Sequence, residues 1–155
     1  MFVFNIRPSK KLAVLFSAVS IMAAVICIIC MTLVHNGYSE TATCDELGTY
    51  SLNAKDTNEQ VSFLKQFGHI AMAESVESSE VIIPNDFNDV YEEYNGLQKQ
   101  IGLNLEKFKG KDASQVRFEL ENSETKYAVL LVHDGKVIGA HLTNGEYGQR
   151  NLPLG

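Results

Sequence analysis

Residues 12–34 form an unbroken run of 23 residues without a charged side chain. At about 1.5 Å rise per residue, a helix of this length spans roughly 34 Å, compared with about 30 Å for the hydrocarbon core of a bilayer. Twelve of the 23 residues are Leu, Ile, Val or Phe, which favour insertion by about 4–7 kcal/mol in total. The run therefore predicts a transmembrane helix that contacts the lipid bilayer over residues 12–34.

The charges on the two sides of this run differ strongly. Residues 1–11 carry three basic and no acidic side chains, whereas residues 35–155 carry ten basic and nineteen acidic ones. Basic residues beside a first hydrophobic segment stay in the cytoplasm, so we expect a single-pass signal anchor in the cell membrane with its C-terminal region outside. A cleaved signal peptide is an alternative, although its apolar core is usually shorter. A buried core helix is another.

The exported region is large enough for one domain. Its aperiodic polar ends predict a tether at residues 35–48 and a flexible tail at 144–155, with the domain at 49–143 between them. Cys44 is its only cysteine, so it could link two chains but cannot close an intrachain disulfide there. A net charge near −9 beyond the anchor excludes nucleic acid as a partner.

Two helices are expected in the domain. Thr57 and Gln60 have the spacing of a capping box, and Gly68 suits the end of the helix that would follow. Asn85 can cap a second helix that ends at Gly102. The apolar residues of this second helix recur at helical spacing, and they are Phe87, Val90, Tyr91, Tyr94, Leu97 and Ile101.

Alternating apolar residues predict strands at residues 50–54 and 116–120, and a shorter one at 80–83. Asp134 and Gly135 are the turn of a β-hairpin between residues 127–133 and 136–142. Uninterrupted pairing across this turn places His133 and His141 on opposite faces. The predicted fold is α+β, with two helices packed on an antiparallel sheet that ends in a three-stranded meander.

Several segments together resemble a known bacterial family. They are Phe63-Leu64, Phe67-Gly68, Val81-Ile82-Ile83-Pro84, Val90-Tyr91-Glu92-Glu93-Tyr94-Asn95, Leu97-Gln98, Leu105, Phe108-Lys109-Gly110-Lys111 and Asp134-Gly135-Lys136-Val137-Ile138-Gly139. In order and spacing, from about residue 50 to residue 143, the chain resembles the membrane-anchored domain-of-unknown-function family 4830. Gly96 and the pair Ala140-His141 depart from the family's pattern. The resemblance implies a single-pass exported topology and supplies no catalytic residue.

No residue pattern points to catalysis, a metal or a cofactor. No serine has the flanks of a nucleophile elbow, and Gly110-Lys111 lacks the rest of a phosphate-binding loop. We therefore expect a non-catalytic binding or regulatory module with a protein partner. The alternatives are a self-associating structural envelope protein and, less favoured, an enzyme or a small-ligand carrier. The candidate interaction surface, for which core packing is the competing interpretation, comprises Tyr91, Tyr94, Asn95, Gln98, Leu130, Val132 and Val137.

Overall fold

The computed structural model describes residues 21–27, 38–146 and 148–155. The chain divides into two compact units, residues 1–38 and 39–155, and residues 21–27 of the first are helical. Among the described residues, no helix combines the length and the apolar character needed to cross a membrane. The predicted N-terminal segment 1–11 lies outside the described residues, as does most of the predicted span 12–34.

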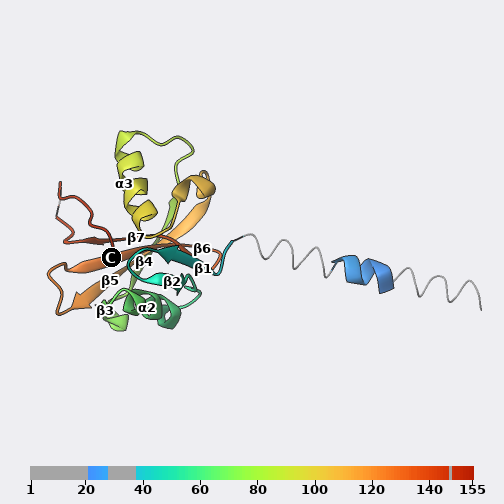
Figure 1. The fold of residues 1–155 in the computed structure, drawn as a ribbon, viewed down its shortest axis with the longest axis horizontal. Helices are drawn as coiled ribbons and strands as arrows, with labels where there is room; N and C mark the ends of the chain where they lie inside the picture. The colour runs from blue at the N-terminus through green and yellow to red at the C-terminus, as the bar shows by residue number, and fades with distance from the viewer. Residues whose placement is uncertain (1–20, 28–37, 147) are drawn as a thin grey trace, which may run out of the picture. The chain divides into compact units, whose positions relative to one another are not determined.

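The second unit has α+β architecture, as predicted. Its strands are β1 (Thr41–Cys44), β2 (Gly48–Ser51), β3 (Ile70–Ala71), β4 (Glu77–Ile82), β5 (Asp112–Glu121), β6 (Tyr127–His133) and β7 (Lys136–Thr143). Its helices are α2 (Thr57–Gln66) and α3 (Asp89–Gln100), with 3-10 turns η1 (Ala73–Ser75) and η2 (Leu105–Phe108). Figure 1 shows the large sheet crossing the middle of this unit, with α3 on one side and α2 on the other.

The main sheet is entirely antiparallel and has the order β3-β5-β6-β7. Strand β4 also pairs with β5, further along the edge that β3 uses. The predicted three-stranded meander is confirmed as β5-β6-β7. The strand expected at residues 80–83 is longer than predicted, because pairing with β5 continues back to Glu77.

A β-bulge in the hairpin corrects the predicted register. Val132 pairs with Val137 as expected, but Leu131 pairs with Gly139 instead of Ile138. Because each strand position alternates between faces, the extra residue moves all later side chains of β7 to the opposite face. His141 consequently pairs with Val129, which lies on the same face as His133, so the prediction of opposite faces for the two histidines is wrong.

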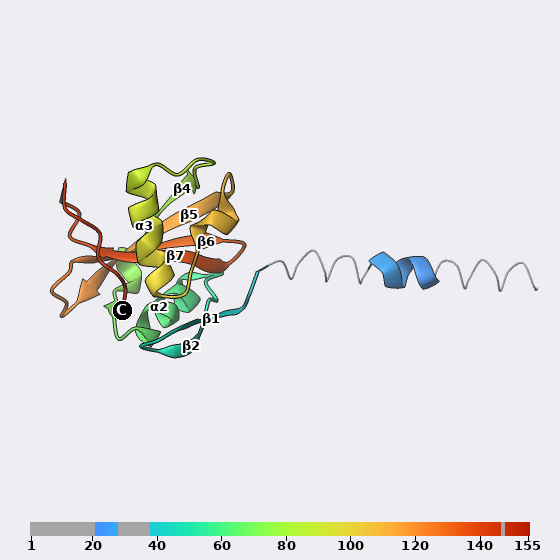
Figure 2. The ribbon, with the colours of Figure 1, turned by 45° about the horizontal axis from the view of Figure 1, so that its top comes forward.

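The main core lies between one face of the sheet and a layer built from α2 and the β1–β2 hairpin. Phe63 and Leu64 of α2 are essentially inaccessible to solvent, and Phe118 of β5 is fully buried against them. Figure 2 shows α2, β1 and β2 together on this side of the sheet. The sheet contributes alternate residues to this core, namely Val116, Phe118, Leu120, Ala128, Leu130, Val132, Val137, Ala140 and Leu142.

The other face of the sheet carries α3 and η2. Leu105 and Phe108 of η2 are buried there. Asn88 caps α3 by accepting a hydrogen bond from the Tyr91 N–H at 2.9 Å, so the helix begins later than the predicted cap at Asn85. Similarly, Asp56 caps α2 by accepting from the Glu59 N–H at 2.9 Å. The predicted capping box of Thr57 and Gln60 is therefore wrong, because the cap is the preceding residue and Thr57 is the first residue of α2.

Both predicted flexible ends belong partly to the folded domain. Thr41–Cys44 forms β1 inside the expected tether, and Cys44 is buried. In the expected tail, Leu154 is buried in the core, and its carbonyl oxygen lies 2.7 Å from His69 Nε2. These segments were predicted to be flexible because most of their residues are polar. Only a few of their side chains are buried, and the residues between them remain exposed.

Gly96 offers a test of helix propensity in α3. A Cβ atom at this position would meet no atom within 4 Å, and alanine stabilises a helix interior by about 1 kcal/mol relative to glycine. We therefore expect Gly96→Ala to raise the free energy of unfolding of the full-length chain by about 1 kcal/mol, measured by urea denaturation. A decrease in stability would mean that α3 is not a regular helix at this point.

Candidate functional site

A groove of about 580 Å³ lies between α3 and the face of the sheet on which His141 is located. Its volume is within the range of small-molecule sites, about 300–1,000 Å³. Its lining residues come from β4, α3, three further strands and the C-terminal segment. They are Val81, Ile82, Pro84, Val90, Tyr91, Glu93, Tyr94, Leu97, Gln115, Leu131, His141, Gln149, Arg150 and Asn151.

The floor of the groove is built by four adjacent strands. Val81, Gln115, Leu131 and His141 come from β4, β5, β6 and β7 respectively. Gln115 and Leu131 are direct cross-strand partners, and the β-bulge brings His141 to this face. The register thus produces a floor that is apolar at β4 and β6 and polar at β5 and β7.

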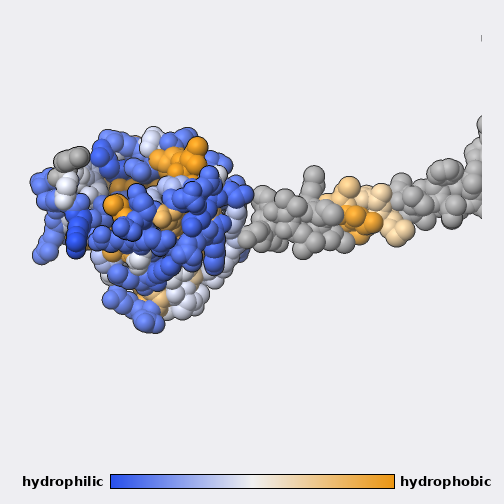
Figure 3. All heavy atoms as spheres, turned by 90° about the horizontal axis from the view of Figure 1, so that it is seen from above, coloured by the Kyte–Doolittle hydropathy of each residue, from blue (hydrophilic) through white to orange (hydrophobic). Residues whose placement is uncertain are grey.

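One wall of the groove is formed by α3. Tyr91, Tyr94 and Leu97 line it, and the two tyrosine rings meet edge-on with centroids 5.6 Å apart. The rim is apolar and open to solvent, because Ile82 is 74% exposed and Val90 is 75% exposed. Figure 3 views the domain from the α3 side and shows a compact hydrophobic patch on a mostly hydrophilic surface.

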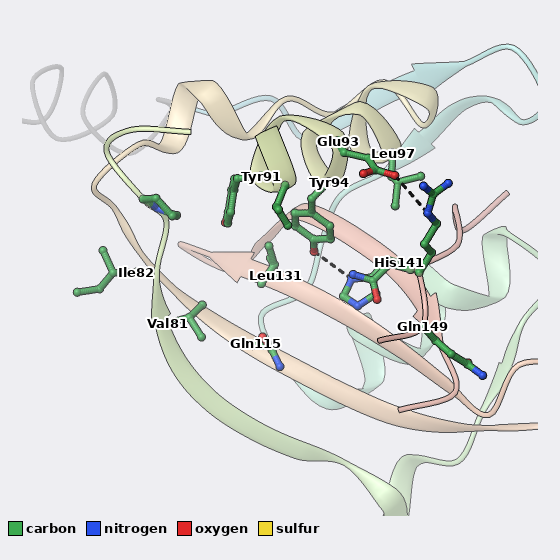
Figure 4. A pocket seen from close by; sticks show the side chains of 14 residues that line it. Val81, Ile82, Tyr91, Glu93, Tyr94, Leu97, Gln115, Leu131, His141 and Gln149 are labelled. Carbon is green, nitrogen blue, oxygen red and sulfur yellow. Dashed lines mark hydrogen bonds and ion pairs between the residues drawn. The ribbon is translucent and has the colours of Figure 1, made fainter. Parts of the chain in front are cut away.

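Tyr94 and His141 form a neutral pair at the base of the wall. The Tyr94 hydroxyl lies 2.9 Å from His141 Nδ1, and Figure 4 shows this contact between α3 and β7. Burial raises the pKa of the Tyr94 hydroxyl above its ordinary value. Burial also lowers the pKa of His141 to about 4. At pH 7 both side chains are therefore uncharged, and the groove contains a hydrogen-bonding pair without an ion.

The low pKa of His141 predicts acid destabilisation. Because the unfolded histidine has a pKa near 6.5, the unfolded chain binds the proton more tightly, and stability falls as the pH decreases from 6.5 toward 4. We expect the free energy of unfolding to decrease by about 2 kcal/mol between pH 7 and pH 5 through this group. Urea titrations of the native chain and of His141→Phe should differ by this amount, and identical pH dependences would contradict the account.

The C-terminal segment closes the groove at its β7 end. Leu142 and Leu152 exchange both backbone hydrogen bonds at 2.9 Å, which holds residues 149–151 over this end. Arg150 Nε lies 3.7 Å from Glu93 Oε1. Both side chains are largely exposed, so this ion pair contributes little to stability.

The structure divides the predicted interaction residues into two groups. Tyr91 and Tyr94 line the groove. Asn95 and Gln98 are fully inaccessible, and their prediction as surface residues is wrong. The predicted surface also included three hairpin residues, Leu130, Val132 and Val137. All three are buried in the main core, on the face of the sheet that α2 covers.

Asn95 and Gln98 are buried because they satisfy backbone groups that have no strand partner. Gln98 Oε1 accepts from the Ala140 N–H at 2.6 Å, on the outer edge of β7. Asn95 Oδ1 accepts from the Leu105 N–H at 2.9 Å, where η2 begins. These contacts fix α3 to the sheet and hold its tyrosines along the groove.

Sequence reasoning missed much of the groove. Gln115, His141 and residues 149–151 were not predicted as site residues. The strand register brings Gln115 and His141 to the groove, and the pairing of Leu142 with Leu152 brings residues 149–151 there. Within the described residues, no group of three or more His, Cys, Asp or Glu side chains could hold a metal ion. The groove lining offers apolar contact, aromatic stacking and hydrogen bonds, together with the charged side chains of Glu93 and Arg150.

This fold and groove define a small α+β domain with an open, partly aromatic groove. The chain belongs to a family that a family model describes as a domain of unknown function (DUF4830), which matches residues 63–142, more than half of the 155 residues. The predicted resemblance is confirmed. Comparison with curated proteins and with solved structures finds no match for this chain.

Proposed function

We propose that this protein is a binding module that takes an apolar or aromatic group into the groove between α3 and the sheet. The observation that supports this function most strongly is the apolar, solvent-open rim of Ile82 and Val90. It leads to a floor and wall that carry only a few polar groups, as ligand sites commonly do. The proposed role is non-catalytic, because the sequence has neither a serine with the flanks of a nucleophile elbow nor a complete phosphate-binding loop.

The proposal places this module outside the cytoplasm, anchored in the cell membrane through residues 12–34. The uncharged length of that run and the step from basic to acidic flanks support the placement. Protease added to intact cells should remove residues 39–155 and leave the N-terminus protected. A domain that resists the protease until the cells are lysed would contradict this topology.

Indole is a suitable first probe, because its ring is aromatic and its N–H can donate a hydrogen bond. We expect full-length protein in lipid nanodiscs to bind indole in a calorimetric titration. Leu97→Asp places a carboxylate in the groove wall, and it should weaken binding at least about tenfold. Leu47→Asp makes the same change at an exposed position between β1 and β2 and should leave the affinity unchanged. Equal affinities for the two variants would reject the groove as the site.

Self-association is the second candidate function, and the structure lowers its support. The hairpin face that could have formed a dimer lies in the core. Cys44 is a free cysteine, and its side chain is buried. A disulfide between two copies would require β1 to detach. Sedimentation of the full-length protein in nanodiscs under oxidising conditions tests this function. Self-association through Cys44 predicts a covalent dimer, whereas the binding-module proposal predicts no dimer.

A further inference from the structure

The outer edge of β4 is open, and it adjoins the mouth of the groove. The Ile83 N–H donates to the Lys111 carbonyl at 2.9 Å, so Ile83 faces β5. Because backbone direction alternates along an antiparallel strand, Ser78, Glu80 and Ile82 direct their N–H and C=O groups away from β5. Among the described residues, none of these outward groups has a hydrogen-bond partner. The strand can therefore accept a further strand.

The opposite edge of the sheet is already covered. On β7, the Val137 N–H donates to the Leu52 carbonyl at 2.8 Å, and Leu142 pairs with Leu152. The Ala140 N–H donates to the Gln98 side chain. Since sheet edges are usually blocked in this way, the open edge at β4 is the place where a partner strand could add.

The side chains of β4 define what such a strand would meet. Val81 lines the groove, so its neighbour Glu80 faces the other side of the sheet. Glu80 accepts a hydrogen bond from the Ser114 hydroxyl at 2.8 Å and has no basic partner among the described residues. A strand added here would place alternate side chains at the apolar mouth of the groove and the others beside Glu80.

The surrounding charge selects the partner. Residues 77–94 contain no Lys or Arg, and their acidic residues are Glu77, Glu80, Asp86, Asp89, Glu92 and Glu93. Among the described residues, Arg117 pairs with Glu77, Arg150 pairs with Glu93, and Lys109 lies over the Phe87 ring. Lys111 lies opposite Ile83, just beyond the end of β4. Carboxylates remain in excess, so a basic partner is favoured, and a second copy pairing edge to edge would bring two acidic strands together.

We propose that the β4 edge and the adjoining groove mouth bind an extended polypeptide segment of alternating apolar and basic residues by strand addition. Main-chain hydrogen bonds to Ser78, Glu80 and Ile82 supply affinity, and the groove mouth and Glu80 supply specificity for apolar and basic side chains. This inference rests on the proposed function, because the apolar side chains of the segment enter the same groove.

The test uses full-length protein in nanodiscs of neutral lipid and a short labelled peptide of alternating Leu and Lys. Binding is followed by fluorescence anisotropy, with empty nanodiscs as the background. We expect a peptide of alternating Leu and Glu to bind at least about tenfold more weakly than the Leu and Lys peptide. A Leu and Lys peptide whose pairing amides are N-methylated should lose affinity by a similar factor. Equal binding of the Lys and Glu peptides would overturn the proposed charge selection.

Ser78→Pro and Ser78→Ala are matched variants for the main-chain contact. Proline removes an outward N–H that β5 does not use, which an edge strand tolerates, whereas alanine keeps it. Ser78→Pro should weaken the Leu and Lys peptide about fivefold, and Ser78→Ala should not change its affinity. Unaltered binding by Ser78→Pro would overturn strand addition.

The indole titration separates the two proposals. If indole binds the native chain but not Leu97→Asp, and no peptide binds, the groove function stands and strand addition is rejected. If neither probe binds, both proposals fail. A concentration-dependent dimer in the absence of peptide, abolished by Ser78→Pro, would identify a second copy as the occupant and overturn the basic partner.

Discussion

Gly102→Ala is expected to reduce the free energy of unfolding by about 4 kcal/mol. Gly102 has a φ of +77°, and a Cβ atom there would lie 2.2 Å from the carbonyl oxygen of Thr43. The left-handed conformation alone costs alanine about 1–2 kcal/mol, and the clash with backbone forces β1 to move. The position also adjoins a buried contact in which the Tyr50 hydroxyl donates to the Ile101 carbonyl, so the end of α3 and the β1–β2 hairpin would separate.

Gly68→Ala is the matched control for this substitution. Gly68 has a φ of +81°, but a Cβ atom there would meet nothing within 4 Å. Only the conformational term applies, so we expect a loss of about 1 kcal/mol. Urea denaturation of both full-length variants measures the difference. Equal losses would show that β1 does not pack against α3, and that residues 41–44 are part of a tether after all.

Gln98→Ala is expected to destabilise the domain by about 3 kcal/mol. Gln98 is completely buried, and its loss leaves the Ala140 N–H without the acceptor now 2.6 Å away. An unsatisfied buried donor costs about 1–3 kcal/mol, and the vacated volume adds to this cost. The amide hydrogen of Ala140 should exchange with solvent faster in the variant, which a purely packing role of Gln98 would not require.

Gln100→Ala provides the control, because Gln100 is the next glutamine in α3 and is exposed. Substitution of an exposed helical residue usually changes stability by less than about 0.5 kcal/mol. A loss of less than about 1 kcal/mol for Gln98→Ala, or an unchanged exchange rate at Ala140, would contradict the assigned contact. In that case α3 would be held by its apolar residues instead.

Local sequence signals predicted the elements of this fold better than the way they pack. The hairpin was predicted directly by the Asp134-Gly135 turn. Strand β5 was predicted by the alternation of Val116, Phe118 and Leu120, which are all buried. The bulge beside Leu131 was not predictable, because Ile138 is as suitable for regular pairing as for a bulge. That single extra residue decides which side chains of β7 face the groove.

The residues of the candidate site were likewise predicted only in part from the sequence. Apolar spacing placed Tyr91 and Tyr94 on one face of α3, and both line the groove. The same spacing predicted an inward Val90, which is mostly exposed, whereas polar Gln98 packs on the sheet. A free N–H on the β7 edge makes a buried glutamine favourable, and this need appears only when the strands are paired.

The most direct test of the proposed function is to locate a bound ligand in the groove by nuclear magnetic resonance. Full-length protein in nanodiscs, titrated with indole, should show saturable shifts of the Leu131 methyl and His141 ring signals, which come from the groove floor. Core residues such as Leu64 of α2, which is fully buried in the main core, should not shift. Unchanged Leu131 and His141 signals, or saturable shifts confined to other surfaces, would contradict the proposed function.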